Sequence, residues 1–263
     1  MNILIFGDIV GRAGRDIFFR ELPRIKEKHN SDFVLVDVDN VAHGFGITER
    51  MANDFFSAGV DVITGGNHLF DQKEALSFLS KEKRFLRPDN MAPSLPGSGV
   101  CETTLYDGRK IITIHLVGCS NMPVIGDNPF LWIDNILKKY ILGANVNAIV
   151  VDFHAETTSE KCALGQYLDG RVSAIVGTHT HVPTADYRIL EHGTAYQTDV
   201  GMCGDYNSVL GMKKEGCIER FTKGYRTCKM TPSEGVGTLY YLSVTTNDKT
   251  GLAESIEFEK IEW

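Results

Sequence analysis

The stretch Asn2-Ile3-Leu4-Ile5-Phe6-Gly7-Asp8-Ile9-Val10-Gly11 opens the chain and decides its fold class. Residues 3–6 form a short apolar run that is typical of a buried strand. The run ends in a Gly-Asp pair and a glycine-rich turn, and a helical stretch over residues 13–29 follows. Pro23 lies inside that stretch, so we expect it to break or kink the helix. Strand, turn and helix in this order predict a βα unit.

This pattern recurs along the chain. Thr48 fits the N-cap of a later helix, and Asp71 with Glu74 resembles a capping box. The end of the chain is rich in predicted strands, with a hairpin turn near residues 247–251. We therefore expect one α/β domain over residues 1–263, with central sheets covered by helices. Strands are predicted over residues 33–38, 60–64, 110–117, 148–153, 173–176, 193–198, 237–245 and 254–261, and helices over residues 48–58, 71–79, 131–140 and 158–168.

Composition narrows the classes of protein to consider. The chain has 263 residues and a net charge of −7, from 27 basic and 34 acidic residues. An acidic chain argues against a strong face for binding long nucleic acids, but a small anionic substrate is still compatible with it. No apolar run reaches the roughly 18 residues that a membrane span needs. The six cysteines form no C-x-x-C pair. We expect reduced thiols, a cytoplasmic location and no membrane partner.

Several predicted strands end in residues that can bind a metal. These strand ends carry Gly7-Asp8, Asp37-Val38-Asp39-Asn40, Gly66-Asn67-His68, Asp152-Phe153-His154 and Gly177-Thr178-His179-Thr180-His181. Ligands in open α/β sheets sit beyond the carboxyl ends of the strands, so these side chains are expected around one crevice. His179 and His181 alternate with Thr180, which places the two imidazoles on one face of an extended segment.

The residue types indicate the chemistry. Carboxylate and amide oxygens combined with imidazoles suit Mn, Fe or Zn. Two such ions about 3.5–4 Å apart can activate water and clamp an in-line displacement at phosphorus. Each element alone has a simpler explanation, because Asp8 could cap a helix and Asp39-Asn40 could form a turn. The combination of all five predicts a metal site.

In this order, the same residues resemble the motif blocks of calcineurin-like metallophosphoesterases. The segments 7–11, 40–44, 152–161, 177–183 and 198–202 are similar to those of the YmdB-like phosphodiesterases of bacteria. The resemblance covers nearly the whole chain. It implies a sandwich of two mixed β-sheets flanked by helices, and a site with two metal ions.

The resemblance also implies a role for each site residue. One metal ion would be held by Asp8, Asp39, Asn40 and His181, and the other by Asp39, Asn67, His154 and His179. Asp39 would bridge the two ions, and His68 would donate a proton to the leaving group. Fe or Mn is expected, with Zn as an alternative. The implied activity is hydrolysis of phosphodiesters, including 2',3'- or 3',5'-cyclic nucleotides, with a regulatory role in bacteria.

Two positions depart from the family pattern. Many metallophosphoesterases have a histidine where this chain has Val10, and Asn40 is the expected substitute ligand. The YmdB-like branch usually has Glu where this chain has Asp39, so the metal spacing or metal preference is expected to differ. Asp37 is a rival for the bridging role, because its side chain shares a face with that of Asp39.

Other residues allow two interpretations each. His43 either contacts substrate or orients the loop after the second strand. His115, inside an apolar strand, is expected to be a buried structural residue. Glu156 and Asp199 are candidates for orienting metal-binding imidazoles. Arg12 and Arg15 either meet a substrate phosphate or, as expected, lie solvated at the start of a helix.

Two rival functions remain open on the sequence alone. The chain could be a phosphomonoesterase or nucleotidase that uses the same site. It could also be a metal-dependent regulatory protein that binds a partner without catalysis. The sequence leaves the oligomeric state open, with a homo-oligomer as one option.

Overall fold

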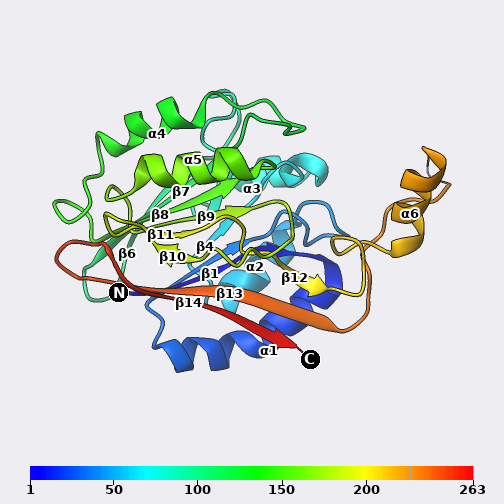
Figure 1. Cartoon of the computed structure of the whole chain (residues 1–263), viewed down its shortest axis with the longest axis horizontal. Coiled ribbons are helices and arrows are strands. Elements are labelled where there is room, and N and C mark those ends of the chain that lie inside the picture. The colour runs from blue at the N-terminus through cyan, green and yellow to red at the C-terminus, as the bar shows by residue number, and fades with distance from the viewer. Residues whose placement is uncertain (226, 263) are drawn as a thin grey trace.

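A computed structural model of the chain describes residues 1–225 and 227–262. In that part, two β-sheets pack against each other, and helices cover their outer faces (Figure 1). Figure 1 shows α4 and α5 over one sheet and α1 along the opposite side of the molecule. The predicted class, an α/β sandwich of two mixed sheets flanked by helices, is confirmed.

The first sheet is built on the strand that opens the chain. Strand β1 runs parallel to β3, β3 to β4 and β4 to β5, while β13 is antiparallel to β1. The C-terminal hairpin adds β14 to β13. In sheet order the strands are β2 (Asp8–Ile9), β12 (Met202–Asp205), β13 (Gly237–Thr246), β1 (Asn2–Phe6), β3 (Phe33–Asp37), β4 (Val62–Thr64) and β5 (Phe85–Leu86), with β14 (Ala253–Glu262) beside β13.

The second sheet has a parallel centre. Strands β7, β8, β9 and β11 run in one direction, and β6 and β10 are antiparallel edges. In sheet order the strands are β10 (Arg188–Ile189), β11 (Ala195–Gln197), β9 (Ala174–Thr178), β8 (Ala148–His154), β7 (Lys110–Val117) and β6 (Val100–Thr104).

The apolar run of β1 is buried on both of its faces. Ile3 and Ile5 belong to the core between the two sheets, together with Val150 of β8. Leu4 and Phe6 point the other way and belong to the core that includes residues of α1 and α2. Side chains alternate between the two faces of an extended strand, so β1 contributes to two hydrophobic cores. This explains why the strand lacks polar residues between Ile3 and Phe6. A third core lies between the second sheet and α4 and α5.

The helices agree with the predictions in part. Helix α1 continues through Pro23, so the predicted break there is wrong. Thr48 caps α2 as predicted, its side chain accepting a hydrogen bond from the backbone N–H of Met51. The predicted capping box is wrong, because α3 begins only at Ala75 and Asp71 contacts His68 instead. The helices are α1 (Gly11–His29), α2 (Glu49–Ser57), α3 (Ala75–Leu79), α4 (Pro129–Leu137), α5 (Thr158–Leu168) and α6 (Lys214–Lys223), with a 3-10 turn, η1, at Leu69–Asp71.

Strand β12 and helix α6 lie between residues 199 and 236, where the sequence predicted no helix or strand. Asn128, rather than a later residue, starts α4 by accepting hydrogen bonds from the N–H groups of Phe130 and Leu131. Across residues 1–225 and 227–262, no helix combines the length and the apolar character that crossing a membrane requires.

Candidate metal centre

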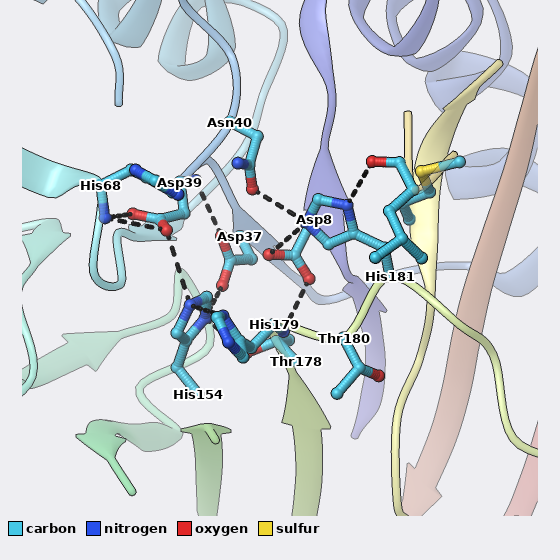
Figure 2. Close-up of polar contacts among 12 residues, drawn as sticks. Asp8, Asp37, Asp39, Asn40, His68, His154, Thr178, His179, Thr180 and His181 are labelled. Carbon is cyan, nitrogen blue, oxygen red and sulfur yellow. Dashed lines mark hydrogen bonds and ion pairs between the residues drawn. The ribbon is translucent and has the colours of Figure 1, made fainter. Parts of the chain in front are cut away.

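The predicted site residues lie at the carboxyl ends of strands from both sheets. Asp8 follows β1, Asp39 and Asn40 follow β3, and Asn67 and His68 follow β4. His154 is the last residue of β8, and His179 and His181 follow β9. Figure 2 shows the labelled carboxylate, amide and imidazole side chains among them converging from the two sheets. The sequence predicted that these residues would converge at the edge of one sheet. In the structure they converge from strand ends of two sheets that meet.

One group of atoms surrounds the end of β1. His181 Nε2 lies 3.1 Å from Asn40 Oδ1 and 3.6 Å from Asp8 Oδ1. Asp8 is fully buried, and its Oδ1 has no hydrogen-bond partner among the described residues. Its Oδ2 accepts a hydrogen bond from the backbone N–H of His179 at 3.0 Å. An unpartnered buried carboxylate oxygen is costly unless a cation or donor compensates it.

A second group of atoms surrounds His154. Its Nε2 lies 3.1 Å from Asn67 Oδ1, 3.1 Å from His179 Nδ1 and 3.5 Å from Asp39 Oδ2. Donor atoms that share one ion at about 2.1 Å lie roughly 3 Å from each other when they are neighbours in the coordination shell. The spacing within this group therefore fits one shared ion.

The directions in which the ring nitrogens of His154 and His179 point indicate why this group of donor atoms needs a cation. His154 Nδ1 faces the Asp37 carboxylate at 3.0 Å, and His179 Nε2 faces the Glu156 carboxylate at 3.0 Å. As donors to these carboxylates, the two nitrogens would carry the ring protons, which would leave lone pairs on His154 Nε2 and His179 Nδ1. Those two lone pairs would face each other at 3.1 Å. A metal ion that accepts both lone pairs would resolve this repulsion.

His181 has the same orientation in the other group. Its Nδ1 lies 2.9 Å from the carbonyl oxygen of Leu210 and can donate to it, so that Nε2 is directed at Asn40 and Asp8. The amide of Asn40 is held in turn, because its Nδ2 donates to the carbonyl of Gly44 at 2.9 Å. The oxygen of that amide is thereby directed at His181.

Burial and neighbouring charges shift the pKa values of the titratable side chains in the site. Burial, followed by the electrostatic effect of the neighbouring His154 ring, lowers the pKa of His179 to about 3, so this imidazole is neutral at physiological pH. Burial alone would raise the pKa of Asp8, but the nearby His181 lowers it well below its ordinary value. Burial, followed by repulsion from Asp8, raises the pKa of Asp37 well above its ordinary value. Crowded buried carboxylates of this kind are typical of cation sites.

Asp37 and Asp39 lie on opposite sides of the His154 ring. Asp37 faces Nδ1, and its other oxygen accepts from the backbone N–H of Asp39 at 2.8 Å. Asp39 faces Nε2 and also accepts from the backbone N–H of His68. Asp8, Asp37 and His154 also offer ligand atoms within 4.8 Å of one another. The orientation of the ring nevertheless favours Asp39 as the ligand and Asp37 as the residue that orients His154. The bridging role of Asp39 stays a prediction.

His68 lies at the edge of the two groups of donor atoms. Its Nδ1 lies 2.7 Å from the Asp71 carboxylate, and its ring is 31% exposed. The Phe45 ring lies edge-on to it, with ring centroids 4.9 Å apart. Sequence reasoning missed Asp71 as its partner, although the spacing of three residues could have indicated the contact. With one nitrogen held by Asp71, the other is available to a ligand.

A layer of polar residues supports the groups from behind. His115 is fully buried, as predicted, with Nε2 3.2 Å from the carbonyl of Gly65 and Nδ1 3.1 Å from Asp152. Asp152 accepts hydrogen bonds from the hydroxyls of Thr64 and Thr178 at 2.6 and 2.8 Å. The sequence contained no spacing that would have joined these four residues, because they come from four strands.

Gly66 is required by the close approach of its backbone to His154. A Cβ atom at this position would lie 2.2 Å from His154 Nε2. Any side chain would therefore displace the ring nitrogen that faces Asn67 and His179.

The other candidates lie outside the two groups. His43 is exposed and adopts a positive φ of 55°. Its predicted contact with substrate stays a prediction. Arg12 is exposed and pairs with Asp16 at 3.3 Å, whereas Arg15 donates to the carbonyl of Val41 at 2.6 Å. Arg15 therefore braces the loop after β3 and is not simply solvated.

Known proteins resemble the chain along its whole length. A 2',3'-cyclic-nucleotide 2'-phosphodiesterase of Bacillus subtilis is 42% identical over 257 residues, which cover 98% of this chain and 96% of that protein. The crystal structure of a novel phosphatase from Mycoplasma pneumoniae has a TM-score of 0.93 at 35% identity, and the match covers all of this chain and 93% of that one. The crystal structure of a hypothetical protein from Thermus thermophilus has a TM-score of 0.91 at 35% identity, with 100% of this chain and 99% of that one covered.

These likenesses support the calcineurin-like fold class that the motifs predicted. The family model described as YmdB-like protein matches residues 4–258. That range includes every predicted site residue, from Asp8 to His181. The chain belongs to the YmdB-like protein family.

Proposed function

We propose that this chain is a phosphodiesterase that uses two metal ions and hydrolyses 2',3'-cyclic nucleotides. At the coarser level it is a hydrolytic phosphoesterase, as its similarity to the Bacillus subtilis enzyme supports. The observation that carries the metal-dependent part is the 3.1 Å approach of His154 Nε2 and His179 Nδ1, two rings whose other nitrogens both face carboxylates.

The donor atoms divide naturally between two ions. Asp8, Asn40 and His181 would hold one ion, and Asn67, His154 and His179 the other. Asp39 would be shared between them. When bound, the ions supply Lewis-acid activation of a water and neutralise charge on the phosphate. Fe or Mn suits this mixture of oxygen and imidazole donors, with Zn as an alternative.

His68 would act as the general acid. Asp71 holds its Nδ1 and leaves Nε2 free to give a proton to the departing alkoxide. The backbone N–H of His68 donates to Asp39, which fixes the imidazole relative to the shared ligand. Burial of Asp8, Asp39 and His154 excludes bulk water from the back of the site.

Metal analysis and kinetics on the same sample test the proposal. Protein purified without chelator is expected to carry close to two equivalents of Fe, Mn or Zn by elemental analysis. It should hydrolyse 2',3'-cyclic AMP, lose this activity with a chelator and recover it when metal is restored. A metal-replete protein that is inert on 2',3'-cyclic AMP, 3',5'-cyclic AMP and bis(p-nitrophenyl) phosphate would contradict the proposal.

A phosphomonoesterase is the second candidate, because the Mycoplasma pneumoniae structure is described as a phosphatase. Comparison of bis(p-nitrophenyl) phosphate with p-nitrophenyl phosphate separates the two activities. A kcat/KM that is higher for the monoester would favour this candidate.

A further inference from the structure

One cavity connects the metal centre to helix α6. It has a volume of about 260 Å³, and its inner end is lined by Asn40, His68, His179 and His181. Its outer end is lined by apolar residues and an arginine: Phe45, Met212, Met230, Arg220 and Phe221. A ligand that reaches the metal centre through this cavity therefore also contacts α6.

Helix α6 is held at its base but stands apart from the sandwich. Met212 forms an isolated antiparallel bridge with Pro232, and the backbone N–H of Lys213 donates to the carbonyl of Thr231 at 3.0 Å. This base packs on the loop after β3, where a Cβ on Gly44 would lie 2.6 Å from Met212 Cε. Figure 1 shows α6 at the margin of the molecule, away from both sheets. The helix thus forms a wall of the cavity without belonging to any of the three cores.

Within residues 1–225 and 227–262, Phe221 belongs to none of the three hydrophobic cores. Its side chain is 82% exposed, although it lines the cavity. An exposed aromatic ring beside a site of this kind is typical of a surface for stacking a flat ligand. Phe45 lies on the other wall, at the edge of the His68 ring.

Arg220 adds a charge beside that ring. The neighbouring carboxylate, Glu219, pairs with Lys223 at 2.8 Å, and within the described residues Arg220 has no ion-pair partner. Its planar guanidinium can donate to the acceptor atoms on the edge of a nucleobase. The chain as a whole is acidic, but residues 213–229 carry six Lys or Arg and two Glu, so this segment is locally basic and suits an anionic nucleotide.

We propose that the outer half of this cavity is a nucleobase subsite, in which Phe221 stacks on the base and Arg220 donates hydrogen bonds to its edge. This inference rests on the proposed function, since it assigns the part of the cyclic nucleotide that lies beyond the phosphate. It makes α6 the element that selects nucleotides over other phosphodiesters.

The test compares a substrate with a base and one without. In the Phe221→Ala variant, KM for 2',3'-cyclic AMP is expected to rise roughly 5- to 150-fold, the range for loss of one base–aromatic stack. The KM for ribose 2',3'-cyclic phosphate, which lacks the base, should stay within about twofold of the wild-type value, because base stacking cannot contribute to its binding. Arg220→Gln should show the same selectivity with a smaller rise.

Ile218 supplies the matched control. It lies on the same helix and is 54% exposed, but it lines a separate depression with Glu215 and Lys223. Ile218→Ala is expected to leave both KM values unchanged. Equal effects of Phe221→Ala on both substrates, or no effect on either, would overturn the subsite.

Calorimetry with adenosine 3'-monophosphate separates this inference from the proposed function, because binding needs no turnover. If the wild-type protein hydrolyses no diester but Phe221→Ala still weakens this binding, the subsite stands and the diesterase proposal fails. If hydrolysis is present and the binding is the same in wild type, Phe221→Ala and Ile218→Ala, the subsite is wrong.

Discussion

Lys161 Nζ lies 2.6 Å from Asp199 Oδ2, and both side chains are only 1% exposed. The same carboxylate accepts hydrogen bonds from the backbone N–H of Thr180 at 3.2 Å and from its hydroxyl at 2.7 Å. Thr180 stands between His179 and His181, and Figure 2 shows its side chain pointing away from the imidazoles. The buried ion pair therefore anchors the segment that supplies two of the predicted ligands.

Lys161→Met tests this anchor. The substitution leaves the Asp199 carboxylate buried without its cation, and breaking a buried pair in this way costs about 3–5 kcal/mol. We expect a lower free energy of unfolding by denaturant, and loss of metal as the segment around Thr180 loosens. The double variant Lys161→Met/Asp199→Leu removes both charges and should recover part of the stability.

An exposed ion pair provides the control for the Lys161→Met variant. Lys110 pairs with Glu102 at 3.0 Å, with side chains 47% and 38% exposed. Lys110→Met is expected to cost less than about 1 kcal/mol and to leave the metal content intact. A Lys161→Met protein as stable and as metal-rich as Lys110→Met would show that the buried pair has no anchoring role.

His68→Ala should separate catalysis from metal binding. Loss of a general acid is expected to lower kcat by roughly 10²–10⁴-fold. The two groups of donor atoms do not include the His68 ring, so the metal content measured by elemental analysis should be unchanged.

Two further variants test the proposed role of His68 as a general acid. Asp71→Asn should lower kcat less than His68→Ala, because it only weakens the orientation of the ring. His192, an exposed histidine that contacts Asp169, is the control, and His192→Ala should have no effect on kcat. Loss of both metals in His68→Ala would refute the assigned role.

The sequence was sufficient to predict which residues would converge, because each candidate lies next to a strand end. Parallel strands bring their carboxyl ends together whatever their neighbours are, so adjacency in sequence became adjacency in space. The sequence also indicated Glu156 and Asp199 as candidates for orienting metal-binding imidazoles. Glu156 does contact an imidazole, whereas Asp199 contacts Thr180 and Lys161 instead. Their partners, His179 and Thr180, became visible only in the structure.

Features that depend on tertiary packing were beyond sequence reasoning. Asp71 has the sequence context of a helix cap, but its contact with His68 takes precedence and α3 starts four residues later, at Ala75. The sequence predicted no helix between residues 199 and 236, and α6, which lies there, belongs to none of the three cores. Pro23 was expected to break or kink α1, whereas the helix continues for another six residues to His29.

Asp39→Asn and Asp37→Asn should have different effects on metal content. Asp39 faces His154 Nε2 and is the expected shared ligand, so Asp39→Asn should lose metal from both groups, together with activity. Asp37 faces Nδ1 of the same ring. Asp37→Asn should keep two equivalents with an affinity lowered about 10- to 100-fold, as for other residues that orient a ligand.

Elemental analysis and metal titration check both variants at the same protein concentration. Asp39→Glu, which restores the residue usual in the related branch, should retain two metals. Full occupancy in Asp39→Asn combined with an empty Asp37→Asn would exchange the roles of the two carboxylates.

Asp186 ties the segment after His181 to strand β11, and its contribution to stability depends on pH. It accepts hydrogen bonds from the hydroxyls of Thr184 and Thr198, both at 2.6 Å. Burial alone would raise its pKa, but these hydrogen bonds lower the pKa below the ordinary value of 3.8. A lowered pKa in the folded state means that the stabilisation is present above pH 3.8 and is lost as the pH falls through the folded-state value.

Asp186→Asn should therefore destabilise the protein near pH 7 and much less in acid. The side chain is 32% exposed, so we expect a cost of only about 1 kcal/mol at pH 7. Denaturant unfolding at pH 7 and at pH 3, on metal-depleted protein, measures the difference from wild type. Asp54→Asn, at an exposed position on α2, is the control and should show no such dependence. If the Asp186→Asn deficit grows as the pH falls, the carboxylate does not stabilise the fold through these hydrogen bonds, because protonation would then have to strengthen them.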